Sequence, residues 1–334
     1  MLPETRDRLF GFQHAFDEPV TLVATLVLAA LLVIAPAVIA AMHKAGRTDE
    51  RRHKELMERY YWWLVIVPVV LVPILAGAFW TIFGVGVLSL LCYREYARVT
   101  GLFREKLTSF LVVVAIIWVT YAALDNWYRL FVALTPLTIA SLAAAAIWPD
   151  QPKGYIQRAA LGVFGFALFG SCLGQLGYLA NDVHYRSILI LVWVSVEAND
   201  VVLYLAGKPL GQRKLCPNTS PYKTVAGAAG AVIFTMLLFA GIGWFVFAGT
   251  RMQAVGHLLG LGALVGVVSQ FGELTLSSIK RDLGIKGTGA TIPGGGGLLD
   301  RCDNILFVAP TVFHYVNYVA EVGLGQATHI FSGG

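Results

Sequence analysis

The chain has 334 residues, of which 57% are hydrophobic and only 13% are charged, and its net charge is +5. A soluble domain contains about 25% charged residues, so this composition excludes a large soluble core and indicates an integral membrane protein. The small positive charge is typical of cytoplasmic loops rather than of a nucleic-acid-binding surface, and we expect no nucleic-acid partner. The four cysteines lack the spacing of a zinc site and are predicted to be free thiols.

Apolar runs long enough to cross a membrane follow one another along the chain, since a spanning helix needs about 20 residues. The second and third runs form one stretch that is too long for a single helix and contains Pro68, Pro73 and Gly77, so we interpret it as a helical hairpin. The predicted fold class is an all-α, polytopic integral membrane protein with about ten transmembrane helices. The runs are 19–42, 61–76, 78–96, 108–124, 129–148, 159–180, 187–206, 224–248, 254–272 and 303–324.

The basic residues divide unequally between the two sides that ten spans would define. Twenty of the 25 Lys and Arg residues fall in alternate loops on one side, and five fall on the other. This positive-inside asymmetry places both termini outside the cytoplasm. We expect a multi-pass protein of the bacterial inner membrane.

The chain is predicted to have two parts, an N-terminal extension and a main membrane domain. Residues 1–60 are predicted to be an N-terminal extension with the first span and a loop, 43–60, whose mixed charges indicate an interfacial amphipathic helix. Residues 61–334 are predicted to form the main membrane domain. Within it, the Asp125–Asn126 pair is interpreted as an exposed turn, and the small residues of 224–248 are typical of close helix packing in lipid.

A first polar segment, 197–227, lies at the end of the seventh span. Asp200 falls within an apolar run, where a carboxylate is costly and is by default a candidate for function; the alternative is a buried, hydrogen-bonded structural residue. Ser220, Lys223 and Thr224 follow in the motif SPYKT, just before the next span. Hydroxyls and an ammonium suit a phosphate site, but a capped helix start explains them equally well.

A second polar segment, Ser277 to Asp303, combines cations, glycines and carboxylates. Lys280, Arg281 and Lys286 can hold phosphates, and glycines allow backbone N–H groups to approach an anion. Asp300 and Asp303 are three apart, so on a helix they share one face and can hold a hard cation together. This combination predicts phosphoryl or nucleotidyl transfer at a membrane surface.

Both segments resemble the integral-membrane phosphatidate cytidylyltransferases, also called CDP-diacylglycerol synthases. The family signature S-x-[apolar]-K-R-x4-K-D, P-G-H-G-G and D-R-x-D is met by Ser277, Ile279, Lys280, Arg281, Lys286, Pro293, Gly294, Gly296, Gly297, Asp300, Arg301 and Asp303. The upstream family pattern is met by Asp200, Tyr204, Gly207, Ser220, Pro221, Lys223 and Thr224, and the GDL element by Gly272, Glu273 and Leu274. The stretch YREYARVTG at 93–101 looks like the polar break after an early span of the family.

Four positions depart from the family pattern. Gly287 stands where the family has Asp, Gly295 where it has His, Ala226 where it has Glu, and Glu273 where it has Asp. The signature therefore lacks three ionisable groups, whereas the DRxD pair and the cations are retained.

The resemblance implies a Mg²⁺-dependent transfer of CMP from CTP to phosphatidate, giving CDP-diacylglycerol and pyrophosphate at the cytoplasmic face. Mg²⁺ would offset the repulsion between the two anionic substrates, and the attacking phosphate needs no strong general base. By resemblance, the catalytic residues are Asp300, Lys280, Arg281 and Lys286; the Mg²⁺ ligands are Asp300, Asp303 and Glu273; and the substrate-binding residues are Asp200, Ser220, Lys223, Thr224, Ser277, Gly294, Gly296, Gly297 and Arg301.

Other interpretations stay open. A divergent member would act on another lipid phosphate, and a non-catalytic paralogue would bind nucleotide or lipid without turnover. A transporter is suggested only by ten spans and Asp200, and it predicts polar sites at the membrane midplane, whereas here the polar groups gather in loops. The resemblance also implies a homodimer among membrane lipids, although no feature of the sequence marks an interface.

Overall fold

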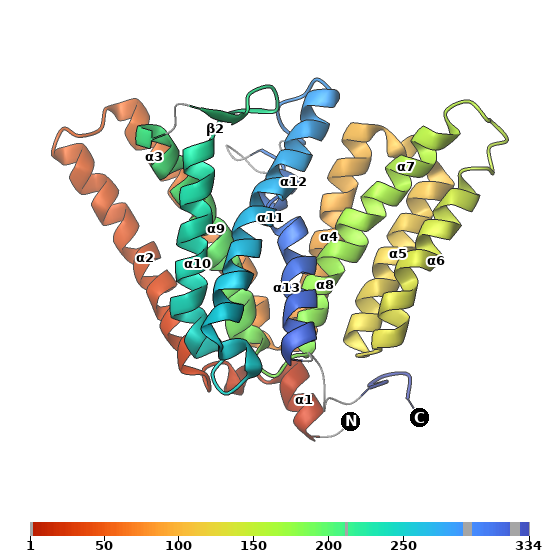
Figure 1. Ribbon diagram of the computed structural model, residues 1–334, viewed down its shortest axis with the longest axis horizontal. Coiled ribbons are helices and arrows are strands. Elements are labelled where there is room, and N and C mark those ends of the chain that lie inside the picture. Colours follow the sequence, from red (N-terminus) through yellow and green to blue (C-terminus); the bar gives the residue numbers. More distant parts are fainter. Residues whose placement is uncertain (1–2, 211–212, 290–295, 321–327, 334) are drawn as a thin grey trace.

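The protein is described here by a computed structural model for residues 3–210, 213–289, 296–320 and 328–333 (Figure 1). Two short strands, β1 (Lys214–Cys216) and β2 (Ser220–Thr224), pair as an antiparallel hairpin, and a π-helical segment, Phe166–Cys172, joins α7 to α8. The α-helices are α1 (Pro3–Phe10), α2 (Pro19–Lys44), α3 (Glu50–Ala76), α4 (Ala78–Thr100), α5 (Lys106–Leu124), α6 (Tyr128–Ala145), α7 (Tyr155–Gly165), α8 (Leu173–Tyr178), α9 (Tyr185–Leu210), α10 (Val225–Val246), α11 (Val255–Asp282), α12 (Leu299–Cys302) and α13 (Ile305–Ala320).

The expected polytopic helical architecture is confirmed. Within the described ranges, nine helical segments are long and apolar enough to cross a membrane; they are α2, α3, α4, α5, α6, the continuous run from α7 to Asn181, α9, α10 and α11. The tenth predicted span, 303–324, corresponds to α13, whose 16 described residues are fewer than the roughly 20 that a crossing requires. The β-hairpin is the exception to an all-α fold, and it occupies the loop that carries SPYKT.

The predicted hairpin between the second and third spans is confirmed. Helix α3 ends at Ala76 and α4 begins at Ala78, with Gly77 at a φ of 135° between them. A Cβ at Gly77 would lie 2.3 Å from the carbonyl oxygen of Leu9, so only glycine fits there. The two prolines lie inside α3. Transmembrane helices tolerate proline because neighbouring groups satisfy the backbone carbonyls that lose a hydrogen bond.

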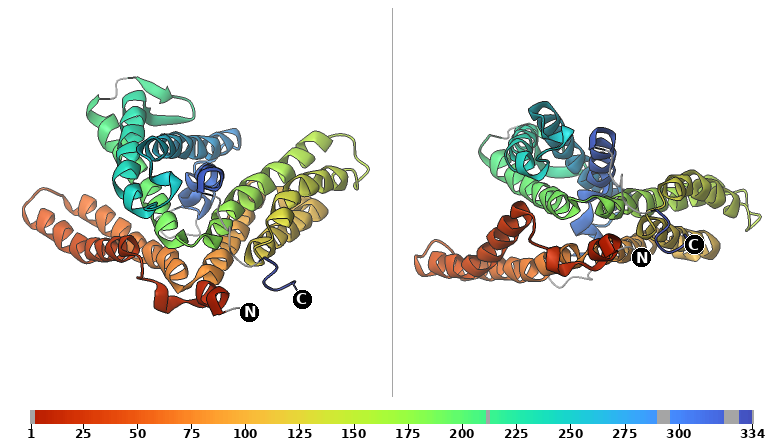
Figure 2. Two further views of the ribbon diagram at one scale, coloured as in Figure 1. Left: turned by 60° about the horizontal axis from the view of Figure 1, so that its bottom comes forward. Right: turned by 90° about the horizontal axis from the view of Figure 1, so that it is seen from below.

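The predicted interfacial helix of 43–60 is not a separate element. Helix α3 begins at Glu50 and continues unbroken into the apolar stretch, so its charged first turns extend the transmembrane helix. Figure 2 shows α2 and α3 together as an arm on one side of the molecule and α5, α6 and α7 as an arm on the other. Helices α9, α10 and α11 form a third group, and α13 packs between α11 and α8.

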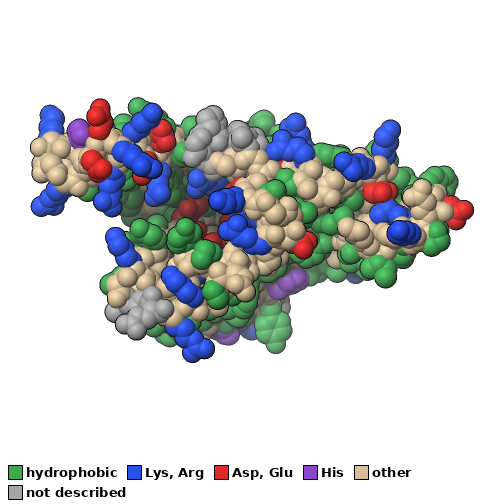
Figure 3. All heavy atoms as spheres, turned by 90° about the horizontal axis from the view of Figure 1, so that it is seen from above, with side chains coloured by type: hydrophobic (Ala, Val, Ile, Leu, Met, Phe, Trp, Pro, Cys, Tyr) green, Lys and Arg blue, Asp and Glu red, His purple; other side chains and the backbone are tan. Residues whose placement is uncertain are grey.

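The loops rich in Lys and Arg lie at one end of the helices, and both chain termini lie near the other (Figure 1). We call the first the basic end. Figure 3, viewed onto it, shows many Lys and Arg side chains and a hollow beside the α2–α3 arm with acidic side chains inside. The sequence-derived charge asymmetry therefore has a physical counterpart in the fold. The basic end comprises the turns at 45–49, 101–105, 146–154, 213–224 and 283–289.

Small residues bring α9, α10 and α11 close together, as the sequence of 224–248 predicted. A Cβ at Gly227 would lie 2.5 Å from the carbonyl oxygen of Leu203, and one at Gly262 would lie 2.7 Å from the Cα of Met236. The helix backbones thus approach without intervening side chains. This packing fixes α11 relative to α9, and both helices carry polar residues of the candidate site.

The Asp125–Asn126 pair is not an exposed turn, so this prediction was wrong. Asp125 is 0% exposed, and its carboxylate accepts hydrogen bonds from the backbone N–H groups of Phe331 (2.6 Å) and Ser332 (3.2 Å). Asn126 is also buried and accepts a hydrogen bond from the Tyr178 hydroxyl at 2.9 Å. The carboxylate holds a segment that is 206 residues away in sequence, which a local pattern does not reveal.

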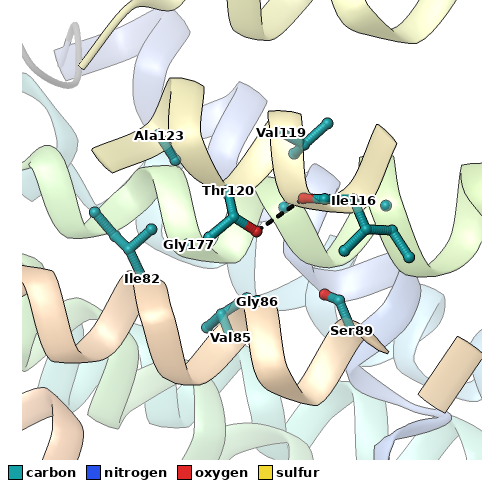
Figure 4. A pocket seen from close by; sticks show the side chains of 11 residues that line it. Ile82, Val85, Gly86, Ser89, Ile116, Val119, Thr120, Ala123 and Gly177 are labelled. Carbon is teal, nitrogen blue, oxygen red and sulfur yellow. Dashed lines mark hydrogen bonds between the residues drawn. The ribbon is translucent and has the colours of Figure 1, made fainter. Parts of the chain in front are cut away.

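A small cavity lies where α4, α5 and the π-helical segment meet (Figure 4). Its volume is about 10 Å³, room for a single water. Ser89 and Thr120 supply the polar wall groups, and the Thr120 hydroxyl donates to the carbonyl oxygen of Ile116 at 2.9 Å. A nucleotide is far too large for this space, so this cavity is not the candidate site.

Replacing Asp125 with Ala should release the C-terminal segment. Two backbone N–H groups lose their acceptor, and we expect amide hydrogen exchange at 329–332 to accelerate about tenfold, which corresponds to about 1.4 kcal/mol. Hydrogen exchange followed by mass spectrometry measures this directly. Asp49→Ala, at an exposed carboxylate of the basic end, is the control. Equal exchange in both variants would contradict the role of Asp125.

Candidate functional site

The polar residues identified in the sequence come together from four elements at the basic end. They are the second half of α9, the hairpin β1–β2, the last turns of α11 and the short helix α12 with the residues after it. Residues 290–295, with the expected substrate-binding Gly294 and the departure at Gly295, lie outside the described residues.

The SPYKT motif is divided between a helix cap and an ion pair. Thr224 caps α10, because its hydroxyl accepts a hydrogen bond from the N–H of Gly227 at 3.1 Å. Lys223 is only 3% exposed, and its ammonium lies 2.5 Å from the carboxylate of Glu273 on α11. Ser220 is half-buried at the start of β2. A buried ammonium needs such a partner, so Lys223 and Glu273 neutralise each other.

Asp200, Glu273 and Asp303 form a cluster of carboxylates that are close enough to repel one another. Asp200 on α9 accepts a hydrogen bond from the side-chain amide of Asn304, and Asp303 accepts one from the backbone N–H of Asn304 at 3.0 Å. Burial raises the pKa of Asp303 well above its ordinary value, and the Glu273 and Asp200 carboxylates raise it further. The mutual repulsion would be relieved by a cation or a proton among these oxygens.

Asp300 is surrounded by hydrogen-bond donors of its own chain. Its Oδ1 lies 2.8 Å from the ammonium of Lys280, and its Oδ2 accepts from the N–H of Thr288 (3.0 Å) and of Gly297 (3.1 Å). Burial acts to raise the pKa of Asp300, but the Lys280 ammonium and these donors outweigh it, so the pKa lies below its ordinary value. Lys280 and Asp300, predicted to hold phosphate and metal, are thus paired with each other.

Glu95 is a site residue that the sequence analysis did not identify. It lies on α4 within the YREYARVTG stretch and is 6% exposed. Its carboxylate accepts from the N–H groups of Leu298 (3.0 Å) and Leu299 (2.9 Å), where α12 begins. A carboxylate is well suited to the unpaired N–H groups of a helix start. The available signal was an acidic residue at the end of an apolar run.

Thr288 joins Glu95 to Asp300. The Thr288 hydroxyl lies 3.2 Å from Glu95 Oε2 and 3.2 Å from Asp300 Oδ2, and the Thr288 carbonyl oxygen accepts from Arg98 at 3.2 Å. Four segments therefore meet at this residue: α4, the stretch after α11, the glycine-containing stretch before α12, and α12 itself.

Packing, rather than access for an anion, explains Gly297. A Cβ at this position would lie 2.3 Å from the Thr288 hydroxyl and 2.6 Å from Glu95 Oε2. Gly296 has a φ of +85°, in the left-handed region that favours glycine. Both glycines let the chain close around the Glu95, Thr288 and Asp300 side chains.

The departure at Gly287 removes a carboxylate from the side of Asp300. A Cβ at Gly287 would lie 3.4 Å from Asp300 Oδ2, an ordinary contact. The Asp that the family pattern has at this position would therefore place its carboxylate next to Asp300. In this chain Asp300 keeps Lys280, a residue of the family signature, as its ionic partner and lacks the second carboxylate.

The other predicted cations lie at the surface around this core. Arg281 is exposed and donates to the carbonyl oxygen of Thr219 at 3.3 Å, and Lys286 and Arg301 are also exposed. Ser277, one turn before Lys280 on α11, is half-buried. Arg281, Lys286 and Arg301 are thus accessible to an anionic ligand, whereas Lys223 and Lys280 are internal partners of carboxylates.

The chemistry of the cluster suits a hard cation, although its geometry is not that of a complete protein cage. Among residues 3–210, 213–289, 296–320 and 328–333, no three His, Cys, Asp or Glu side chains are arranged to hold a metal ion. Mg²⁺ is usually bound by one or two carboxylates together with substrate phosphates and waters. Asp303 fits that requirement, whereas Glu273 and Asp300 would first have to exchange their contacts with Lys223 and Lys280.

Comparison with known proteins identifies a family whose model covers most of the chain. The family model described as the cytidylyltransferase family matches residues 57–319. The chain is 29% identical over 280 residues to uncharacterized protein YnbB of Escherichia coli strain K12, covering 81% of this chain and 91% of that protein. It is 40% identical over 129 residues to a phosphatidate cytidylyltransferase of Synechocystis, covering 39% of this chain and 43% of that protein.

A phosphatidate cytidylyltransferase of Bacillus subtilis strain 168 is 32% identical over 192 residues, covering 55% of this chain and 65% of that protein. The chain thus spans less than two thirds of the length of these two enzymes. The match is continuous across α4 to α13, the helices that carry the site described above.

Replacing Gly297 with Ala should destabilise the site. The added methyl would overlap the Thr288 hydroxyl and Glu95 Oε2, and overpacking of this kind costs about 1–3 kcal/mol. We expect the apparent melting temperature in detergent to fall by a few degrees. Gly256→Ala is the matched control, because a Cβ there meets nothing within 4 Å. Equal melting temperatures for the two variants would contradict the prediction, because they would show that the chain around Gly297 accommodates the methyl group without loss of stability.

Proposed function

Because the chain belongs to the cytidylyltransferase family, we propose that it transfers CMP from CTP to phosphatidate or a closely related lipid phosphate, releasing pyrophosphate. The observation that carries this proposal is the meeting of Asp200, Glu273, Asp300 and Asp303 with internal and exposed cations at the basic end of the membrane helices. We place this end at the cytoplasmic face of the inner membrane, where CTP is available and lipid headgroups are within reach.

The proposed reaction is an in-line displacement at phosphorus. An oxygen of the lipid phosphate forms a bond to the α-phosphorus of CTP, the bond from that phosphorus to the bridging oxygen breaks, and pyrophosphate leaves with its electron pair. The nucleophile is already anionic at neutral pH, so no side chain must remove a proton. The chief obstacle is the repulsion between two anions.

The chain's own cations address that repulsion. Arg281, Lys286 and Arg301 are exposed and can contact phosphate oxygens. Lys280 is less exposed and forms an ion pair with Asp300. Ser277 and Ser220 provide hydroxyl donors at the same end. Asp303 would hold Mg²⁺, joined by Glu273 and Asp300 where these exchange their contacts with Lys223 and Lys280, and the ion would supply Lewis-acid stabilisation of the phosphates.

One observation favours a second candidate, a divergent member with another lipid phosphate or without turnover. Gly287 leaves Asp300 without a second carboxylate beside it, and Ala226 stands where the family has Glu after SPYKT. Fewer carboxylates bind a divalent cation less tightly. The two experiments below separate these candidates.

The first experiment asks whether the reaction occurs. Membranes that contain the chain receive CTP, phosphatidate and Mg²⁺, and liponucleotide is quantified against Asp300→Asn at equal protein levels. We expect the native chain to exceed the variant by about 100-fold or more, because Asn loses the ionic contact with Lys280 and cannot accept from all the same donors. Product no greater than with Asp300→Asn would exclude this activity.

The second experiment restores the missing carboxylate. Gly287→Asp should lower the Mg²⁺ concentration for half-maximal effect about tenfold, because two carboxylates would then face one position. The backbone at Gly287 is not in the left-handed region, so a side chain is tolerated. Gly287→Asn, with the same shape and no charge, is the matched control. Mg²⁺ titration by calorimetry and by turnover should agree; identical titrations for Asp and Asn would refute a cation position beside Asp300.

A further inference from the structure

A single hydroxyl lies between two carboxylates beneath the site. Thr288 is 4% exposed, and its Oγ1 is equidistant, at 3.2 Å, from Glu95 Oε2 and Asp300 Oδ2. A hydroxyl carries one proton and can donate it to only one of the two carboxylates at a time. Thr288 therefore links a residue of a transmembrane helix to a residue of the candidate active centre.

Neither carboxylate depends on Thr288 alone for a donor. Glu95 Oε2 also accepts from the Leu299 N–H at 2.9 Å, and Asp300 Oδ2 also accepts from the Gly297 N–H at 3.1 Å. The hydroxyl is thus not needed merely to avoid a buried, unsatisfied charge. Its distinctive effect is geometric, because it fixes the distance between the two carboxylates.

The element that needs such fixing is α12. It has only four residues, Leu299–Cys302, and a single helical turn is not stable without tertiary contacts. It nevertheless carries Asp300 and precedes Asp303, the two acidic residues of the DRxD motif. Glu95 anchors the beginning of this turn, and Thr288 holds Asp300 against the same carboxylate.

We propose that Thr288 and Glu95 are positioning residues: they dock α12 on α4 so that Asp300 and Asp303 are held in a fixed orientation at the basic end. This inference rests on the proposed nucleotidyl transfer for its effect on rate. The docking itself is independent of any reaction. It predicts that loss of the Thr288 hydroxyl lowers turnover more than it lowers the affinity for CTP.

The decisive variants are Thr288→Val, which removes the hydroxyl with little change in shape, and Thr288→Ser, which keeps it. We expect kcat per folded molecule to fall about 10-fold to 100-fold in the Val variant, with the KM for CTP changed less than about threefold. The Ser variant should restore most of the activity, and Glu95→Gln should resemble the Val variant. Thr250→Val, whose hydroxyl donates to Phe247 at the opposite end, is the control for the substitution itself.

Cys302 provides a readout that needs no activity. Its thiol contacts the thiol of the fully buried Cys92 on α4, so its alkylation rate reports whether α12 stays docked. With a maleimide and mass spectrometry of the Cys302 peptide, we expect several-fold faster labelling in Thr288→Val and Glu95→Gln, and native rates in Thr288→Ser and Thr250→Val.

The outcomes separate this inference from the proposed function. An inactive native chain whose labelling still accelerates in Thr288→Val refutes the reaction and supports the docking. An active chain in which Thr288→Val changes neither kcat nor labelling refutes the positioning role and leaves the reaction standing. A lower melting temperature of Thr288→Val with an unchanged kcat per folded molecule would also overturn the positioning role, because Thr288 would then contribute only to stability.

Discussion

A carboxylate buried at the end of a membrane helix must be surrounded by hydrogen-bond donors, and the candidate site is organised by how Glu95 meets this requirement. Its donors come from the backbone of Leu298 and Leu299 and from the Thr288 hydroxyl. Satisfying one charge on α4 thereby draws in two loop segments and fixes where α12 begins. The same rule explains the pairs Lys223–Glu273 and Lys280–Asp300, in which cations stabilise carboxylates of their own chain.

The sequence predicted the large elements well because their causes are local. Apolar length and charge asymmetry located the spans, and the break at Gly77 followed from two prolines and a glycine in one long run. It also identified the polar residues that gather at the basic end. What it missed depends on distant partners: Asp125 is buried because a segment 206 residues away returns to it, and Glu95 matters because α12 begins against it.

The glycines show why a motif match does not give a residue's role. Gly297 matches the family signature and suggested an anion site, yet the space it leaves is filled by Thr288 and Glu95. Gly287 departs from the signature, and the space it leaves lies beside Asp300. The first glycine permits the site to close, and the second leaves it with one fewer charge. Only three-dimensional neighbours distinguish these two cases.

Helix α2 lies at the edge of the fold and is the span least buried in protein. It has 26 residues, about 39 Å at the usual rise, and no residue of its apolar window is buried in the protein. A typical hydrocarbon layer is about 30 Å thick, so a helix of this length must incline to keep its apolar surface within it. Most of its surface faces the acyl chains, whereas Val20, Ala24, Leu28 and Leu32 pack against the rest of the protein. Among the nine spans of the described ranges, α2 is therefore the one whose solvation free energy depends most on the membrane and least on the protein.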